Sequence, residues 1–273
     1  MTTRTTSEKR TIFRELHRAG CFVLPNPWDI GGARALEGLG FKAIATTSAG
    51  YAWSQGRPDG KLDRAEVLAH MHQMANSTDL PVNADFESGF AATLEELRES
   101  VRMAVDTGVA GLSIEDSTGD PNAPLLDIDV AVQRMRAARA AIDETGGETL
   151  LVGRAENFFV GRPHLDDAIA RLKAYSQAGA DCLYAPGIKT REEISAVLAA
   201  VAPKPLNVLI GWPSDLTVQD LTSLGVRRIS IGGALARAAW GGFLGAAETI
   251  ARDGRFDGFA DMPTGARING MFR

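Results

Sequence analysis

The stretch that decides the fold reads PVNADFESG and occupies residues 81–89. A short apolar run bounded by proline and glycine predicts a buried strand, which here ends in two acids. Asp85 and Glu87 are two positions apart, so on a strand their side chains point to the same face. Two like charges on one face repel each other unless a cation lies between them, and Mg²⁺ takes oxygen ligands that include one or two carboxylates. The alternative is a turn with solvated acids, and this stretch alone leaves both interpretations open.

The same alternation of a short apolar run and a helical segment continues on both sides of this stretch. Strands are expected at residues 21–24, 43–47, 82–86, 111–116, 150–154, 182–185, 206–210 and 228–233. Helices are expected at residues 7–18, 30–39, 64–75, 93–105, 128–142, 166–178, 191–201, 217–224 and 235–251. A loop of small residues at 48–50 and a longer one reaching to residues 59–60 separate the second strand from the helix at 64–75.

Eight alternations without a shift in composition predict a (β/α)₈ TIM barrel that forms a single domain over residues 1–273. An N-terminal helix at about 7–18 precedes the barrel, and an irregular Gly-rich tail at about 252–273 follows it. A glycine between helix and strand, typical of the turns of such a barrel, recurs at Gly40, Gly108, Gly179 and Gly225. A doubly wound open sheet is the competing architecture, but it usually has about five or six strands.

Composition excludes several classes of function. The net charge is -5 and no basic run is present, so nucleic acid is an unexpected partner. No run approaches the roughly 18 apolar residues of a membrane span, and the polar N-terminus has no secretory h-region. Cys21 and Cys182 each open an apolar run, which predicts buried thiols in a reducing compartment. A cytoplasmic protein is therefore expected, without a membrane partner.

In a barrel of this type the active site lies at the C-terminal ends of the strands. The residues delivered there are Thr47, Ser48, Ala49 and Gly50 from the second strand, Asp85 and Glu87 from the third, Glu115 and Asp116 from the fourth, Arg154 and Glu156 from the fifth, Asn207 from the seventh, and Gly232 and Gly233 from the eighth, with Asp59 in the loop after the second. Neighbouring strands therefore deliver several acids and one arginine to the same rim. Any one of these acids taken alone would more often be a solvated loop residue.

The residue types at this rim favour a metal site built on oxygen ligands. Asp85, with Glu87 and Glu115 close to it, suits Mg²⁺ or Mn²⁺. The four histidines fall on or beside predicted helices, so zinc is not expected. Arg154 suits a bidentate grip on a carboxylate, the alternative being a salt bridge to a neighbouring acid, Glu115 or Glu156.

The implied ligand is a small dianion or a 2-oxo acid. The loop at residues 47–49 suits a carboxylate or an oxyanion through its hydroxyls and amides, although ordinary turn hydroxyls are an equal alternative. A metal chelated by a 2-oxo carboxylate stabilises an enolate, which serves C–C cleavage or decarboxylation.

Several motifs resemble those of the isocitrate lyase/phosphoenolpyruvate mutase superfamily. They keep their order and spacing over about residues 24–239 and read TSAG at 47–50, GRPDG at 56–60, NADFESGF at 83–90, GVAGLSIED at 108–116, GRAE at 153–156 and AGAD at 178–181. The resemblance implies a barrel that exchanges its eighth helix with a neighbouring subunit, giving a dimer and usually a homotetramer. It also implies Mg²⁺ bound at Asp85, with Asp59, Glu87 and Glu115 helping mostly through water.

The resemblance further implies roles for individual residues. Thr47, Ser48 and Ala49 would hold the carboxylate of a 2-oxo acid, and Arg154 and Asn207 would bind the rest of the substrate. Asp59, Arg154 and Glu115 are the expected catalytic residues.

The chain departs from the superfamily in the loop after the fourth strand. Lyases of the superfamily carry a catalytic cysteine there and the phosphonopyruvate enzymes a lysine, whereas residues 117–124 read STGDPNAP. Both cysteines begin predicted strands at the opposite end of the barrel, so neither replaces it. After the sixth strand, where lyases have a glutamate and mutases a histidine, this chain has Pro186. It looks closer to the oxaloacetate decarboxylase-like or 2-oxo-acid-binding members.

The resulting hypothesis is a Mg²⁺-dependent lyase or decarboxylase that acts on a small, oxaloacetate-like 2-oxo acid through a metal-stabilised enolate. Decarboxylation tolerates the missing cysteine, because water can protonate the enolate. Two alternatives remain. One is a hydrolase or mutase of the P–C bond of phosphonopyruvate. The other is a protein that binds a 2-oxo acid with little turnover.

Overall fold

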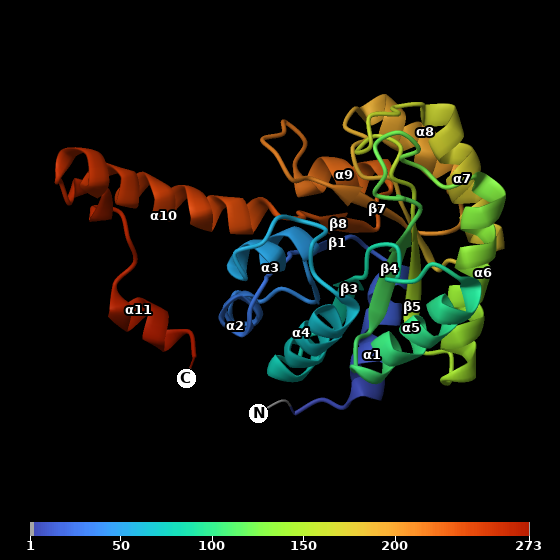
Figure 1. The fold of residues 1–273 in the computed structure, drawn as a ribbon, viewed down its shortest axis with the longest axis horizontal. Helices are drawn as coiled ribbons and strands as arrows, with labels where there is room; N and C mark the ends of the chain where they lie inside the picture. The colour runs from blue at the N-terminus through green and yellow to red at the C-terminus, as the bar shows by residue number, and fades with distance from the viewer. Residues whose placement is uncertain (1–2, 273) are drawn as a thin grey trace.

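The computed structural model describes residues 3–272 and consists of eight parallel strands with helices around them (Figure 1). The strands are β1 (Phe22–Leu24), β2 (Ile44–Ala45), β3 (Val82–Asp85), β4 (Gly111–Glu115), β5 (Leu150–Arg154), β6 (Cys182–Tyr184), β7 (Leu206–Leu209) and β8 (Arg228–Ser230). The helices are α1 (Thr6–Arg18), α2 (Ile30–Gly38), α3 (Ser48–Ser54), α4 (Arg64–Ser77), α5 (Leu94–Asp106), α6 (Ile128–Glu144), α7 (Leu165–Gln177), α8 (Arg191–Val201), α9 (Val218–Leu224), α10 (Ala234–Asp253) and α11 (Gly265–Gly270), with a 3₁₀ turn, η1 (Asp257–Phe259).

The eight strands close into a barrel. Their order is β1-β8-β7-β6-β5-β4-β3-β2, and every neighbouring pair in this order is parallel. The gap between β1 and β2 is bridged by two hydrogen bonds, from the Ala45 amide to the Pro25 carbonyl (3.0 Å) and from Asn26 Nδ2 to the Thr46 carbonyl (2.9 Å). The predicted (β/α)₈ barrel is therefore confirmed, and all strand C-termini meet at one rim.

The N-terminal end of the barrel is closed by an apolar plug. Phe13 of α1 is fully buried and packs with Phe22, Leu24, Leu150 and three alanines at the end of the barrel. Burying a phenylalanine contributes about 1.5–3 kcal/mol, and Phe13→Ala would cost about 3–5 kcal/mol because a cavity would remain. The plug leaves the opposite end of the barrel as the open one, which is where the acidic residues lie.

Local sequence signals explain most helix boundaries. Thr93 caps α5, and its hydroxyl and the Glu96 carboxylate form the reciprocal capping box that the sequence predicts. The loop glycines behave as expected. Gly179, between α7 and β6, has φ of +106°, and a Cβ there would lie 2.5 Å from Cγ of Arg139.

Three local predictions are corrected by the structure. Residues 48–50, expected as a loop, begin helix α3, because the hydroxyl of Thr47 caps it by accepting from the Gly50 amide (3.3 Å). Strand β3, expected to reach residue 86, ends at Asp85, and Glu87 adopts φ of +47°, so the two acids do not share one face of a strand as predicted. The tail beyond residue 252 is more regular than expected, since it contains η1 and α11.

Helix α10 leaves the barrel. It begins at the rim and projects away from the body of the molecule, with η1 packed on it and α11 beyond (Figure 1). Large apolar side chains along this part of the chain are exposed, including Trp240, Phe243 and Leu244. No helix within residues 3–272 is long and apolar enough to cross a membrane.

Candidate active site

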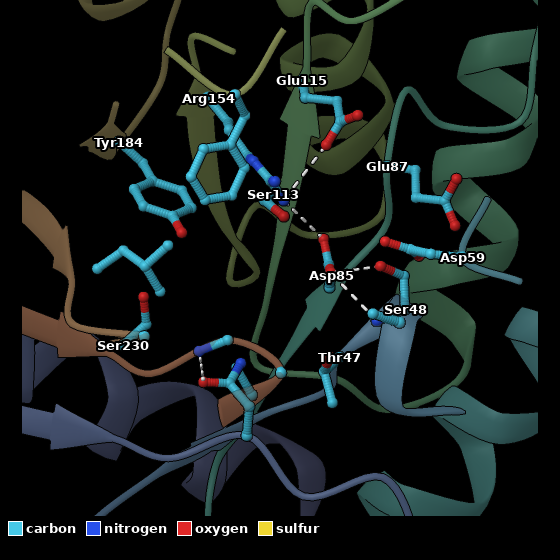
Figure 2. Close-up of a pocket in the computed structure, with 18 of the residues that line it drawn as sticks. Thr47, Ser48, Asp59, Asp85, Glu87, Ser113, Glu115, Arg154, Tyr184 and Ser230 are labelled. Atoms are coloured by element: carbon cyan, nitrogen blue, oxygen red, sulfur yellow. Dashed lines mark hydrogen bonds and ion pairs between the residues drawn. The ribbon is translucent and has the colours of Figure 1, made fainter. Parts of the chain in front are cut away.

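A pocket of about 770 Å³ opens at the C-terminal rim of the barrel. Its wall contains nearly all the residues that the sequence predicts for the site: Thr47, Ser48, Ala49, Asp59, Asp85, Glu87, Glu115, Arg154 and Glu156. Figure 2 shows the acids and the arginine converging from different strands and loops on one space. The barrel therefore brings together residues that are up to about a hundred positions apart in the sequence.

Arg154, the last residue of β5, is at the centre of the acidic cluster. Its Nη1 lies 3.0 Å from Asp85 Oδ1 and 3.3 Å from Glu115 Oε2, and its Nε donates to Glu156. Its Nη2 makes no hydrogen bond to another described residue. Burial opposes the charge, but the three carboxylates raise the pKa of Arg154 well above its ordinary value. The guanidinium is thus a fixed cation with donors still available to a ligand.

Asp85 is held from two sides. Its backbone amide donates to Thr46 Oγ1 (2.9 Å), which fixes the end of β3 against the end of β2. Its Oδ2 accepts hydrogen bonds from the Ser48 hydroxyl (2.9 Å) and the Ser48 amide (3.2 Å). The carboxylate therefore has one oxygen toward Arg154 and the other toward the start of α3 (Figure 2).

The remaining acids repel one another in partly desolvated positions. Burial, followed by the charges of Asp85 and Asp59, raises the pKa of Glu87 to about 7. Burial and the charge of Asp85 also raise the pKa of Asp59, which belongs to an exposed loop but turns its side chain toward Asp85 and Ser48 (Figure 2). The pKa of Glu115 lies well above its ordinary value because the side chain is desolvated, although Arg154 opposes that effect. The site accumulates negative charge that a single arginine does not neutralise.

This charge pattern supplies a test of whether a divalent cation fits. Within residues 3–272 no group of three or more His, Cys, Asp and Glu side chains stands at distances that would hold a metal on their own. Direct coordination by Asp85, Glu87 and Glu115 together is therefore absent from the geometry. Asp59, Asp85, Glu87, Glu115 and Glu156 nevertheless gather around Arg154 at this pocket, and Mg²⁺ usually keeps several waters. The residues fit a cation held by one carboxylate, with the other acids acting through water.

The 47–49 segment lies at the pocket, but part of its hydrogen-bonding capacity is already used. The Thr47 hydroxyl accepts from the Gly50 amide, and both the hydroxyl and the amide of Ser48 donate to Asp85. Ala49 lines the pocket beside them. The segment is therefore a support for Asp85 as well as a candidate surface for a substrate carboxylate.

Asn207 is not brought to the pocket surface. It is fully buried in β7, where its Nδ2 donates to the Ser230 hydroxyl (2.9 Å) and its Oδ1 accepts from Arg228 Nε (2.9 Å). The predicted buried thiols also differ from each other, because Cys182 is buried but Cys21 is only half-buried. Neither cysteine lines the pocket.

Sequence reasoning missed four pocket residues that point into the barrel: Ser113, Tyr184, Arg228 and Ser230. They belong to strands predicted correctly, but Ser113 and Arg228 precede the strand ends, and Tyr184 and Ser230 end strands that were expected to continue further. Their alternation with apolar neighbours was the available signal, since inward and outward residues alternate along a strand.

The loop after β4 borders the pocket and is anchored by the residue that precedes it. Residues 117–119 line the pocket, and Ser117 pairs with Leu125 in an antiparallel bridge. Asp116 is buried and accepts hydrogen bonds from the Tyr175 hydroxyl (2.5 Å), Arg171 Nη1 (3.0 Å) and the Glu156 amide (2.8 Å). The start of the loop is thus anchored at Asp116. The loop offers no cysteine, histidine or lysine to the pocket.

Comparison with known proteins now identifies the family. The sequence pattern of the family described as phosphoenolpyruvate phosphomutase matches residues 13–251, which is most of the chain. The chain belongs to this family.

Members of the family and of its superfamily include similar proteins with known names. An oxaloacetate decarboxylase of Paraburkholderia xenovorans (strain LB400) is 32% identical over 235 residues, which cover 82% of this chain and 75% of the relative. A solved structure from Burkholderia cenocepacia J2315, described only provisionally as a lyase/mutase, matches with a TM-score of 0.94 and 46% identity over 98% of this chain and 97% of its own. A 2,3-dimethylmalate lyase, described as a member of the PEP mutase/isocitrate lyase superfamily, matches with a TM-score of 0.85 and 25% identity over 99% and 95% of the two chains.

These matches confirm the resemblance predicted from the motifs, and with it the prediction that the chain is an enzyme of this superfamily. They cover the barrel and the acidic pocket together. The reaction is a separate question, because the loop after β4 lacks the residues that mark the lyase and phosphonopyruvate branches.

Proposed function

We propose that this chain is a cytoplasmic, divalent-metal-dependent lyase that acts on a small 2-oxo acid, with oxaloacetate as the preferred candidate and decarboxylation as the reaction. The observation that carries this proposal is the cluster of Asp85, Glu115 and Glu156 around Arg154, in a pocket to which the loop after β4 brings no cysteine, histidine or lysine. The similarity to an oxaloacetate decarboxylase supports the choice of substrate.

The chain's own residues would position the substrate. A 2-oxo acid carries a carboxylate next to a ketone, and Arg154 Nη2 is available to donate to it. The pocket wall at Ala49 and Thr47 lies on the same side as Asp85 and offers a second surface to the carboxylate. Fixed donors of this kind orient the bond to be broken and need no rearrangement during the reaction.

Asp85 would be the principal metal-holding residue, with Glu87, Asp59 and Glu115 contributing through water. Mg²⁺, or Mn²⁺ in its place, acts when bound as a Lewis acid on the 2-oxo group. Ser48 would orient Asp85, because both its hydroxyl and its amide donate to Oδ2. The loop after β4 supplies no cysteine, histidine or lysine, so water admitted at the pocket mouth would protonate the product enolate.

The loop after β4 favours decarboxylation over cleavage of the isocitrate lyase type and over P–C bond chemistry. Cleavage in the manner of isocitrate lyase needs an acid/base residue at this loop, and residues 117–124 contain no cysteine, histidine or lysine. The P–C bond chemistry of a phosphonopyruvate hydrolase or mutase is favoured by the family name, but the loop lysine associated with it is missing. A 2-oxo-acid-binding protein with little turnover needs only the intact pocket.

The test is pyruvate formation from oxaloacetate with Mg²⁺. The wild-type protein is compared with Asp85→Ala and with Asp166→Ala, an exposed aspartate on α7 that controls for the loss of a carboxylate. We expect Asp85→Ala to fall to the background rate of free Mg²⁺ and Asp166→Ala to match the wild type. Equal rates for all three proteins would reject the proposal.

The alternatives give distinct results in the same assay series. Phosphate or phosphoenolpyruvate released from phosphonopyruvate, followed by ³¹P NMR, would assign P–C chemistry instead. Binding of oxalate in a calorimeter without turnover of any acid in a substrate panel would assign a binding protein.

We also propose that α10 packs on a second copy of the chain, as the exchange of the eighth helix in the superfamily implies, to give a dimer or a homotetramer. Trp240 and Phe243 are 38% and 62% exposed on a helix that projects from its own barrel (Figure 1). Monomeric proteins rarely leave neighbouring large apolar side chains exposed to water in this way. A second subunit would bury them.

A further inference from the structure

The pocket does not stop at the acidic cluster but continues down into the barrel. Ala45, Asn83, Ser113, Arg228 and Ser230 also line it, and all of them belong to strands rather than loops. The interior of a TM barrel of this kind is normally filled by branched apolar side chains. Here the space below Asp85 is lined by Asn83, Ser113, Tyr184, Arg228 and Ser230, which we call the interior well.

Arg228 is the charged residue of the interior well. It is 3% exposed and reaches across the barrel from β8 to β3, where its Nη1 donates to Asn83 Oδ1 (3.2 Å) while its Nε donates to Asn207 Oδ1 (2.9 Å). Its guanidinium lies over the ring of Phe13, 5.9 Å from the centroid, so the apolar plug seals the well from below. Both hydrogen-bond partners are neutral amides.

No carboxylate within residues 3–272 forms an ion pair with Arg228, and its Nη2 makes no hydrogen bond to them. Burial lowers the pKa of Arg228, and the only groups that oppose this effect are Cys182 and Tyr184. An arginine nevertheless stays protonated in a protein. The well therefore holds a desolvated positive charge without a counter-charge, which is costly unless an anion accompanies it.

Two hydroxyl groups face the same space. Tyr184 is 8% exposed, and its hydroxyl interacts with the Ser230 hydroxyl, which also accepts a hydrogen bond from Asn207 Nδ2. The two hydroxyls turn toward each other in Figure 2. Burial raises the pKa of Tyr184 to about 12, so this group remains a hydrogen-bond donor at neutral pH. The interior well thus combines one cation with a pair of hydroxyls, of which one O–H remains available to a ligand.

We propose that the interior well binds a small anion, supplied either by the terminal carboxylate of a ligand whose other end lies beside Asp85 or by a free halide. Asn83 precedes Asp85 by two residues on the same face of β3, so the well lies roughly 7 Å deeper than the acidic cluster. A five-carbon chain with four bonds of about 1.5 Å is of comparable length. The carboxylate source rests on the proposed function, because it places a 2-oxo acid at Asp85, and the halide source does not.

The first experiment compares two ligands of equal chain length. With Mg²⁺ present, 2-oxoglutarate and 2-oxovalerate are titrated into the protein in a calorimeter, since they differ only in the terminal carboxylate. We expect the wild type to prefer 2-oxoglutarate by roughly 10- to 100-fold, because a charge-assisted hydrogen bond is gained. Arg228→Gln should remove the preference, and Arg228→Lys should retain part of it.

The second experiment addresses the halide. Crystals soaked in bromide are examined for anomalous scattering, and we expect a bromide between Arg228 and Tyr184 in the absence of a dicarboxylate. Bromide in the well without a preference for 2-oxoglutarate would assign the site to free anions. Absence of both signals, with only water in the well, would overturn the proposal.

Two measurements keep the test decisive. Tyr184→Phe removes a single hydroxyl, so it should reduce the preference several-fold even if Arg228→Gln does not fold. Oxalate binding, which needs only the acidic cluster, reports on the proposed function separately. Loss of oxalate and 2-oxovalerate binding would reject the proposed function, whereas equal binding of 2-oxovalerate and 2-oxoglutarate would reject the carboxylate source alone.

Discussion

Arg154 Nη1 lies 3.0 Å from Asp85 Oδ1, which joins the last residue of β5 to the last residue of β3. Strand β4 runs between these two and contributes Glu115, 3.3 Å from the same nitrogen. The guanidinium on β5 therefore contacts the acids at the ends of two neighbouring strands, β3 and β4. A divalent cation bound at Asp85 must share that carboxylate with Arg154, so charge balance in the pocket depends on both cations.

The first prediction concerns Arg154→Lys. Lysine has one compact ammonium group and cannot reproduce the planar fork that contacts Asp85, Glu115 and Glu156 together. We expect kcat/KM for oxaloacetate to fall by roughly 100-fold or more, by analogy with the loss of other fixed donors. Arg154→Gln should also lower the free energy of unfolding by about 3–5 kcal/mol, because buried carboxylates lose their partner.

Steady-state kinetics and urea unfolding measure these two effects. Arg191→Lys provides the control, since Arg191 pairs with Asp220 on the surface and the same replacement there should cost less than about 1 kcal/mol. Wild-type kinetics for Arg154→Lys would show that the guanidinium is only a structural charge.

Much of the fold follows from sequence patterns that are local. The strand at 150–154 and the helix at 191–201 begin and end at the predicted residues, because turn residues and capping groups border them clearly. Helix α3 was missed because Ser48, Ala49 and Gly50 are typical of loops. It forms through tertiary contacts, among them the stacking of Tyr51 on His70 of α4 at 3.7 Å.

The acidic part of the site could be predicted because the C-termini of parallel strands must meet at one rim. The interior well could not, because Tyr184 and Arg228 begin or end apolar strands and resemble core and edge residues there. Their convergence depends on the closure and stagger of the barrel, which bring β8 opposite β3. No local pattern encodes that distance.

The second prediction concerns Glu87→Gln. If Glu87 supports the metal through water, removing its charge should weaken Mg²⁺ binding by roughly 10- to 100-fold while leaving the fold intact. The dependence of activity on Mg²⁺ concentration and direct calorimetry both measure this, after removal of metal with EDTA. Glu95→Gln, an exposed acid of α5, is the control. An unchanged affinity for Mg²⁺ would place the ion away from Glu87.

The third prediction concerns the cysteines. Neither Cys21 nor Cys182 lines the pocket, and burial raises the pKa of the Cys182 thiol to about 11, so neither is a reactive thiolate at the site. The double variant Cys21→Ala, Cys182→Ala should keep the wild-type kcat within about twofold, although the small cavity at Cys182 lowers stability by roughly 1 kcal/mol. Loss of kcat with an unchanged circular dichroism spectrum would contradict a cysteine-independent reaction.

The fourth prediction concerns pH. Burial lowers the pKa of His70 to about 4, below its ordinary value near 6.5, although its Nε2–H donates a hydrogen bond to the Trp28 carbonyl (2.9 Å). Between these pH values the unfolded chain binds a proton at His70 that the folded chain does not. The contribution of His70 to the free energy of unfolding is therefore fully present above about pH 6.5. It decreases as the pH falls toward 4, by up to about 3 kcal/mol.

Urea unfolding at several pH values between 4 and 7 measures this slope. His70→Gln should reduce it, and part should remain because burial also lowers the pKa of His17, to about 3. His72→Gln, on the exposed side of the same helix, controls for the loss of an imidazole from α4. An identical slope in wild type and His70→Gln would contradict the prediction.

The last prediction concerns assembly through α10. Trp240 and Phe243 form an edge-to-face pair, with centroids 5.6 Å apart, on the exposed surface of a helix that projects from the barrel. Exchange of such a helix between copies buries the same apolar surface twice across a two-fold axis. The double variant Trp240→Asp, Phe243→Asp should therefore convert an oligomer into a 29.1 kDa monomer in light scattering, whereas Glu248→Gln on the same helix should not. A monomeric wild type at micromolar concentration would contradict the prediction. In that case no second subunit covers α10, and the aspartate variant would have the same mass as the wild type.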